Sequence, residues 1–557
     1  MGMRNVIWTW LEERRYIFAA AILISLALTC IIFLSFLLKA GVVNTGDLTW
    51  PYFNEPGLTG LYLDNTQSGL IPSQMLVYSW LFYLPLDTAI QERLLLMGVF
   101  FLMGVSCYYA TFRILQQEGA EKKLAYVVAG AATVAYVVNP LNFYYLVDLF
   151  LLIGFALVPA LIYVVLRFLR SEGSIKDIVV HGVLTGIIMT ASSGDPRWPI
   201  WNLFLIMIIL LVYLVLGRFK GLSKSVGFLI ITGICFTALS AFWIVPTLAA
   251  SGHSTLLTRS NLSINFYYVL NKYATLDNTI ILQSDFWTPS RELFLISDTF
   301  LNSIWKTAQM VLPALAFISI LFFRRNRTVI SLLIISLIVI LLASAPLSPL
   351  QFLKDAYQSL VFEAPFGIAF RTSYKWLLIL VYPYVLLASF TILGLSRLPS
   401  KFNLKVPRLR LDGRRLTKVV AGSLVTLLVA SSLIAAWPLV TGDCRGVIAP
   451  EELASDYVEA FDLIQDASGG DLGFKILYLP TNPYMGFEAP GLADSPYLHY
   501  IITNLESGNV TTAGGLLAPL GVKYIILDKF DYSKDVMESS LRNQTDLMIR
   551  LDGERLL

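Results

Sequence analysis

The side chain best placed for chemistry is Asp47, in the run Val42–Pro51 just after the first hydrophobic segment. A carboxylate beside hydrocarbon is costly and usually has a task there. The flat rings of Trp50 and Tyr52 follow it and would suit stacking on a sugar or contact with lipid headgroups. We therefore take Asp47 as a candidate general base. The alternative is that it caps an interfacial helix beginning at Leu48.

A second charged motif, Ser193–Pro199, lies in a predicted turn between two hydrophobic segments. Its Arg197 could hold a phosphate, its Asp195 is a second acidic candidate, and its Trp198 is a further candidate for stacking on a sugar. The simpler alternative is an ion pair between Asp195 and Arg197 that stabilises the turn.

A third motif, Phe370–Trp376, opens a late hydrophobic segment. Arg371 and Lys375 are four residues apart, so on an α-helix they share one face. They would sit at a helix amino terminus, where the macrodipole and free N–H groups favour anions. The spacing predicts a phosphate cradle, and a lipid-linked sugar phosphate is the anion expected there. Alternatively, both side chains contact lipid headgroups or extend towards water.

Composition indicates the class of protein that carries these motifs. Of the 557 residues, 56% are hydrophobic and only 14% are charged. A bilayer core of ~30 Å needs roughly 20 apolar residues per helix. The chain is therefore predicted to be an α-helical polytopic membrane protein with about eleven transmembrane helices. The predicted segments are residues 17–39, 93–115, 124–139, 149–169, 178–192, 200–217, 226–250, 307–323, 328–345, 375–395 and 418–438.

The basic residues are concentrated before the first segment and in every second connection between segments, which indicates an orientation under the positive-inside rule. They include Arg14, Arg15, Lys122, Lys123, Arg167, Arg170, Lys176, Arg218, Lys220, Lys224, Arg324, Arg325, Arg327, Arg397 and Lys401. All of them join one face. The amino terminus is therefore expected in the cytoplasm and the carboxyl terminus outside the cell membrane.

The expected organisation is a transmembrane domain over residues 1–438 and a small external α/β domain over residues 439–557. Long external loops are expected at 40–92, 251–306 and 346–374. Within the carboxyl-terminal domain, Glu451–Ala467 has helical periodicity, while Phe474–Leu479 and Val522–Leu527 are typical of short buried strands. Residues 58–84 favour helices lying along the membrane surface.

In order along the chain, these motifs resemble those of the GT-C superfamily of polytopic membrane glycosyltransferases. The likeness is narrower to prokaryotic membrane proteins related to the actinobacterial arabinofuranosyltransferases, and it covers roughly residues 10–395. Besides Gly46-Asp47, Asp195-Pro196 and the Arg371 and Lys375 pair, the matching residues are Asn139, Pro140, Gly154 and Pro159.

The resemblance implies transfer of a sugar from a polyprenyl-phosphate donor to an external glycan, lipid or protein acceptor. It assigns Asp47 as the catalytic carboxylate, and we expect inversion at the sugar. The first loop has no adjacent acid pair, so the second carboxylate is left to Asp195 or Asp64, and a divalent metal is possible but not assigned. Membrane lipids are expected partners and nucleic acid is not. Two alternatives stay open: a lipid or glycan transporter (flippase), and a non-catalytic scaffold of surface-glycan assembly.

Overall fold

The computed structural model divides the chain into two compact units, each described here by itself. The first joins Met1–Leu37 with Arg93–Val447, and the second joins Leu38–Glu92 with Ile448–Leu557. The described residues are 3–34, 37, 44–45, 48–49, 86, 88–146, 149–171, 173–195, 197–249, 264–283, 299–364, 367–397, 404–406, 409–411, 413–440, 456, 459–460, 463, 475–479, 496–527 and 534–548.

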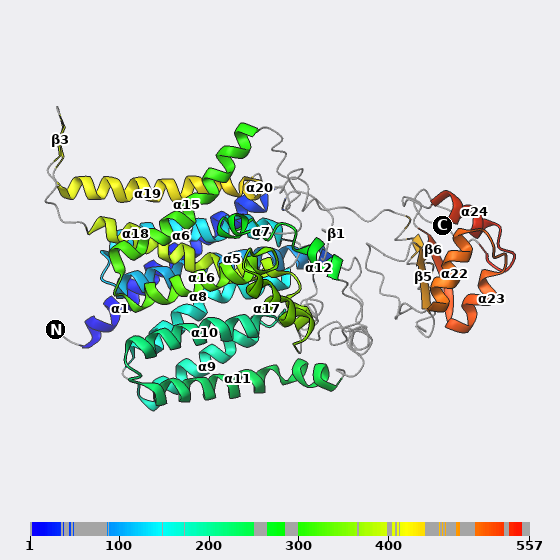
Figure 1. The fold of residues 1–557 in the computed structure, drawn as a ribbon, viewed down its shortest axis with the longest axis horizontal. Helices are drawn as coiled ribbons and strands as arrows, with labels where there is room; N and C mark the ends of the chain where they lie inside the picture. Colours follow the sequence, from blue (N-terminus) through cyan, green and yellow to red (C-terminus); the bar gives the residue numbers. More distant parts are fainter. Residues whose placement is uncertain are drawn as a thin grey trace. The chain divides into compact units, whose positions relative to one another are not determined.

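The first unit is a bundle of α-helices that run side by side (Figure 1). The long helices are α1 (Met3–Ile32), α5 (Thr88–Gln117), α6 (Lys122–Val137), α8 (Leu149–Arg170), α9 (Ile175–Ala191), α10 (Arg197–Leu216), α11 (Leu222–Ala249), α15 (Thr299–Phe323), α16 (Arg327–Ser344), α18 (Val381–Ser396) and α19 (Gly413–Ala435). The shorter elements are α7 (Pro140–Tyr144), α12 (Ile264–Leu270), α13 (Leu276–Ile280), α17 (Gln351–Phe362), α20 (Trp437–Val440), the 3-10 helices η2 (Ala345–Leu347), η3 (Gly367–Phe370) and η4 (Ser373–Ile379), and the strands β3 (Leu404–Val406) and β4 (Leu409–Leu411).

Every predicted transmembrane segment contains a helix, but not every helix is long enough to count as a span. Among the described residues, eight helices are long and apolar enough to cross a membrane. A ninth span results if η4 and α18, which meet at 42°, are taken together. The two remaining helices, α6 and α9, have 16 and 17 residues. The fold is thus that of a helical polytopic membrane protein, and the count of eleven spans is not established.

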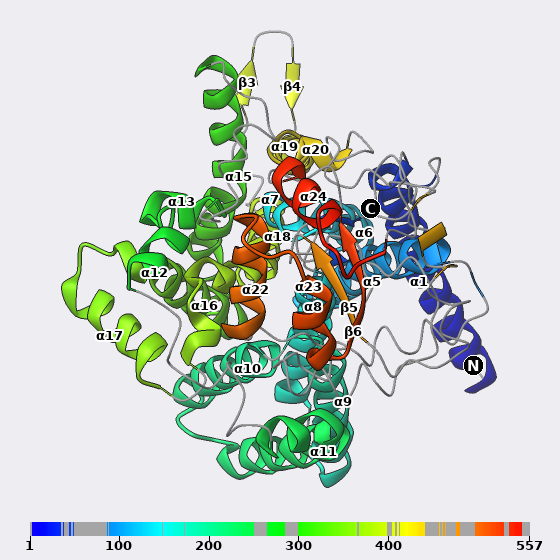
Figure 2. The same ribbon diagram turned by 90° about the vertical axis from the view of Figure 1, so that its right-hand side faces the viewer.

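The outer surface of the bundle is apolar, as a lipid-facing surface must be. On α10, Trp201 and Leu205 are buried while Leu211 is 56% exposed. Ile234 on α11 is 62% exposed. A helix at a water interface would be polar on its outer face. Viewed along the helices, α9, α10 and α11 gather on one side of the bundle and α15 and α19 on the other (Figure 2).

Side-chain caps fix where several helices begin. Asn139 accepts from the Asn142 amide at 3.1 Å, and Pro140 opens α7, so the chain turns between α6 and α8. Asn326 accepts from the Thr328 amide at 2.9 Å at the start of α16. Such caps replace the hydrogen bonds that a helix end lacks.

The second unit contains two parallel strands, β5 (Lys475–Leu479) and β6 (Val522–Leu527). Both strands lie where the sequence predicts them. The helices α22 (Pro496–Glu506), α23 (Ala513–Leu517) and α24 (Lys534–Arg542) and the 3-10 helix η6 (Ala518–Leu520) accompany them. Their shared core consists of Leu477, Ile501, Leu505, Ala513, Leu517, Leu527 and Leu541. The predicted surface helices over residues 58–84 lie outside the described residues, as does most of Glu451–Ala467.

Candidate functional site

The first-loop candidates all lie outside the described part of the chain. This applies to Asp47, Trp50, Tyr52 and Asp64. Leu48 is described, however, and it belongs to a short strand, β2 (Leu48–Thr49), paired antiparallel with β1 (Asn44–Thr45). No helix begins at Leu48, so the alternative in which Asp47 caps such a helix is wrong.

The Asp195 carboxylate and the Arg197 guanidinium form a two-point ion pair where α10 begins. Nε of Arg197 donates to Oδ1 of Asp195 at 2.6 Å, and a terminal guanidinium nitrogen donates to Oδ2. The Arg197 backbone amide also donates to Oδ1, at 2.9 Å. Asp195 is 3% exposed. The simpler expectation for this motif, a turn-stabilising ion pair, is therefore confirmed.

The charge of Lys375 also acts on Asp195, although Lys375 is far away in the sequence. Burial raises the pKa of Asp195, but the charge and hydrogen bonds of Arg197 and the charge of Lys375 outweigh it and hold the pKa below its ordinary value. The Lys375 ammonium lies 5.9 Å from the centre of the Tyr145 ring. Arg197 thus pairs directly with Asp195, Lys375 lies within electrostatic reach of it, and Asp195 stays ionised.

Arg371 does not share an α-helical face with Lys375. Arg371 lies in a bend between η3 and η4, and Lys375 is inside η4. A 3-10 helix has three residues per turn, so the i, i+4 alignment expected for an α-helix is lost. Asn271 fixes the bend, because its Nδ2 donates to the Arg371 carbonyl at 2.7 Å and its Oδ1 accepts from the Ser373 amide at 2.9 Å. The predicted shared α-helical face is therefore wrong, whereas the phosphate-binding role of the two cations stays a prediction.

An aromatic cluster packs around this charge cluster. Trp201 lies 5.9 Å from Trp376 between ring centres, and Phe370 stacks on Trp376 at 5.4 Å. The Arg197 guanidinium lies 5.9 Å from the Trp201 ring centre. The indole Nε1 of Trp201 is buried and has no acceptor among the described residues. Such an unpaired buried donor costs about 1–3 kcal/mol.

Trp198 is a packing residue in this structure. It is fully buried, and its Nε1 donates to the Leu151 carbonyl at 3.0 Å. A Cβ atom at Gly154 would lie 2.3 Å from atoms of its ring, so α8 admits the indole only because residue 154 is glycine. Trp198 has no face left for a sugar, and its expected stacking role is not supported.

Tyr357 on α17 holds Phe370 and Trp376, two members of the aromatic cluster, in place. Its hydroxyl donates to the Phe370 carbonyl at 2.8 Å and accepts from Nε1 of Trp376 at 3.2 Å. Burial raises the pKa of the phenol far above its ordinary value, so the hydroxyl keeps its proton for the Phe370 carbonyl. The sequence offered no signal for Tyr357 or Asn271. Trp201, four residues after Arg197, could have been found from helical spacing.

The described ranges contain no group of three or more His, Cys, Asp or Glu side chains placed to hold a metal ion. No known protein-family model matches the chain, and no curated protein matches it either.

Proposed function

We propose that the protein is a membrane glycosyltransferase that uses a polyprenyl-phosphate sugar donor at the external face. The amino terminus would be cytoplasmic and the carboxyl-terminal unit external. The observation that carries the proposal is that Arg197 pairs with Asp195 while the charge of Lys375 acts on the same carboxylate. These residues come from separate parts of the chain, and they lie at the helix ends that the charge bias assigns to the outside.

In the proposed reaction, Asp47 takes the proton of an acceptor hydroxyl, which then attacks the anomeric carbon of the donor. The bond from that carbon to the phosphate oxygen breaks, and the phosphate leaves with the bonding electrons. Positioned proton transfer typically contributes about 10²–10⁴-fold. Lys375, Arg371 and Arg197 would stabilise the charge that develops on the phosphate, which preorganised cations do well in a water-poor site.

The structure favours a changed role for Asp195. Arg197 engages both oxygens of this carboxylate, so it is poorly placed to act as a second base. We propose that Asp195 is a positioning residue that orients the Arg197 guanidinium. The unpaired indole N–H of Trp201 would supply a further donor to a bound oxygen.

The test uses the full-length protein reconstituted in vesicles with a mixture of polyprenyl-phosphate sugars and an extract of cell-envelope glycans. Mass spectrometry would follow the loss of each donor and the release of polyprenyl phosphate. We expect Asp47→Asn to lower turnover by about 10²–10⁴-fold. We expect Lys375→Ala to lower it by about 10²-fold. If the wild-type protein consumes no donor, with or without divalent metal, the proposed activity is wrong.

Lys354→Ala is the matched control for Lys375→Ala. Its ammonium lies 5.0 Å from the centre of the Tyr268 ring, a contact of the same kind, but Lys354 is not among the charges that act on Asp195. Turnover by Lys354→Ala should equal that of the wild type. Equal losses in both lysine variants would mean that Lys375 has no specific part in donor use.

A further inference from the structure

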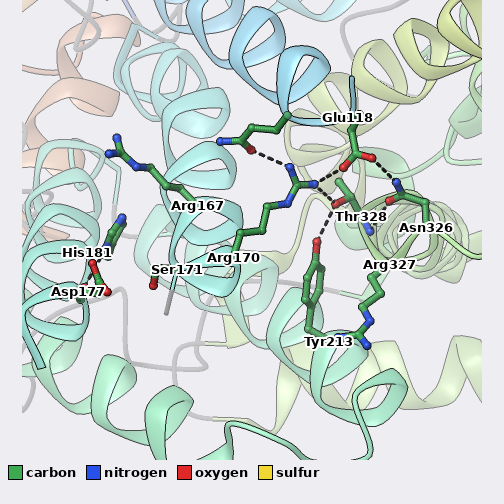
Figure 3. Close-up of a pocket in the computed structure, with 11 residues that line it drawn as sticks. Glu118, Arg167, Arg170, Ser171, Asp177, His181, Tyr213, Asn326, Arg327 and Thr328 are labelled. Carbon is green, nitrogen blue, oxygen red and sulfur yellow. Dashed lines mark hydrogen bonds and ion pairs between the residues drawn. The ribbon is translucent and has the colours of Figure 1, made fainter. Parts of the chain in front are cut away.

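A polar cavity of about 650 Å³ lies at the helix ends opposite the Asp195 cluster. Helix α10 starts at Arg197 and spans 20 residues, about 30 Å, and its distal residue Tyr213 lines this cavity. The carboxyl-terminal ends of α5 and α8 and the amino-terminal ends of α9 and α16 form the other walls (Figure 3). Its charged lining residues are Glu118, Arg167, Arg170, Asp177 and Arg327, and the imidazole of His181 also lines it.

One side of the cavity is held by a network centred on Glu118. The Glu118 carboxylate pairs with Arg170 and accepts from Nδ2 of Asn326 at 2.6 Å. Arg170 also donates to the Thr328 hydroxyl at 3.0 Å, and the Tyr213 hydroxyl lies 2.7 Å from that same oxygen. The network fixes α5, α8, α10 and α16 relative to one another, and it neutralises Arg170.

Arg167 is left outside this network. Figure 3 shows its guanidinium on the opposite wall with no hydrogen bond or ion pair to the other side chains drawn. Asp177 also lines this wall, and its carboxylate accepts from the Ser174 hydroxyl at 2.8 Å and the Ser174 amide at 3.3 Å. The charge of Lys224 acts on this carboxylate, whereas that of Arg167 is not among the charges that do. Within the part of the chain that the structure describes, Arg167 therefore has no ion-pair partner.

An apolar groove of about 540 Å³ continues from this wall between helices of the bundle. Arg167, Asp177 and His181 line both the groove and the polar cavity. The groove itself is lined mainly by apolar side chains of α1, α5, α8 and α9, among them Phe18, Tyr109, Ala160, Val164 and Leu184. A phosphate at Arg167 would thus lie at the mouth of a groove suited to a hydrocarbon chain.

We propose that this combined site binds one anionic phospholipid, with its phosphate at Arg167 and an acyl chain in the groove. The charge balance selects the anionic headgroup: Arg167, Arg170, Lys176 and Arg327 line the two spaces together, against the carboxylates of Glu118 and Asp177. Guanidinium groups pair well with phosphate oxygens. The proposal does not depend on the glycosyltransferase activity, because the two sites lie at opposite ends of α8 and α10.

The experiment is a titration of the purified full-length protein in detergent with phosphatidylglycerol or phosphatidylcholine, followed by native mass spectrometry of the retained lipid. We expect retention of phosphatidylglycerol over phosphatidylcholine. Arg167→Gln should weaken phosphatidylglycerol binding about tenfold, as expected for loss of one charge-assisted contact. Arg325→Gln is the matched control, because Arg325 is an exposed cation before α16 that lines neither space. It should bind as the wild type does.

A second variant tests the acyl chain separately. Ala160→Phe should fill the groove and abolish phosphatidylglycerol binding, whereas Val127→Phe, on the exposed face of α6, should not. Equal retention of the two lipids, or unchanged binding by Arg167→Gln, would overturn the proposal. So would full competition by inorganic phosphate, which would indicate a free anion, or preferential retention of a polyprenyl phosphate. If Ala160→Phe fails to fold, the comparison of Arg167→Gln with Arg325→Gln and the competition by inorganic phosphate still test the proposal.

Discussion

The two ends of the helical bundle each hold an arginine–carboxylate pair, and the two pairs differ in burial. At the Asp195 end, the side chains of Arg197 and Asp195 are 14% and 4% exposed. At the opposite end, those of Arg170 and Glu118 are 27% and 16% exposed and border a cavity. An arginine–carboxylate pair therefore stabilises a buried turn at the Asp195 end and lines an open cavity at the other end.

The largest expected effect separates the two pairs by stability. Asp195→Ala leaves the Arg197 charge poorly solvated, and breaking a buried pair in this way costs about 3–5 kcal/mol. Glu118→Ala should cost about 1 kcal/mol, because water can reach Arg170. Thermal unfolding of both variants in one detergent would measure the difference. Equal losses would show that burial does not distinguish the two ends.

Packing around Trp198 offers the next effect. Gly154→Ala should destabilise the protein by about 1–3 kcal/mol, because the added methyl group would lie 2.3 Å from the indole. Gly98→Ala on α5 is the control, since nothing lies within 4 Å of the added atom. The control should be neutral or stabilising by up to about 1 kcal/mol. A well-tolerated Gly154→Ala, seen in the same unfolding assay, would mean that this end is less tightly packed than described.

The pH dependence of stability sharpens the comparison further. The pKa of Asp195 is lower in the folded than in the unfolded protein, so its contribution is present above the unfolded value of about 3.9 and is lost as the pH falls through the folded one. Between about pH 5 and 3, the unfolding temperature of the wild type should fall more steeply than that of Asp195→Asn. Parallel slopes would contradict the lowered pKa.

The smallest expected effect on stability belongs to Arg167. Its side chain is exposed and makes no polar contact within the described residues, so Arg167→Gln should change stability by no more than about 0.5 kcal/mol. Its effect should instead be on phospholipid binding. A large loss of stability in the absence of lipid would mean that Arg167 is structural, like Arg197.

The helices were predictable because long apolar runs leave few alternatives to a membrane-spanning helix, and the caps at Asn139 and Ser174 follow from local chemistry. The Asp195 and Arg197 pair was also foreseeable, since the two residues are nearly adjacent. The approach of Lys375 to that pair could be expected only from the order of motifs along the chain. Nothing in the sequence indicated that Asn271 would hold the bend at Arg371.

The cavity near Arg167 was missed for a different reason. Arg167, Arg170 and Arg327 fit the positive-inside pattern, and that pattern explained them without any need for a ligand. Only the tertiary structure distinguishes Arg170, which has Glu118 beside it, from Arg167, which has no such partner among the described residues. Basic residues that set the orientation of the protein in the membrane can therefore also line a binding site. Their positions in the sequence do not show which of them do so.

The network centred on Glu118 has a consequence for the order in which the bundle is assembled during biosynthesis. Glu118 receives Arg170 from α8, Asn326 from the start of α16, and, at its carbonyl oxygen, Arg397 from the end of α18. The ribosome must therefore make more than 200 further residues after Glu118 before Asn326 can reach it, since the two are 208 positions apart. Until then Arg170 is the only one of these three partners that Glu118 can have. The contacts of Glu118 are therefore completed only when α16 and α18 pack against α5 and α8, which are made earlier.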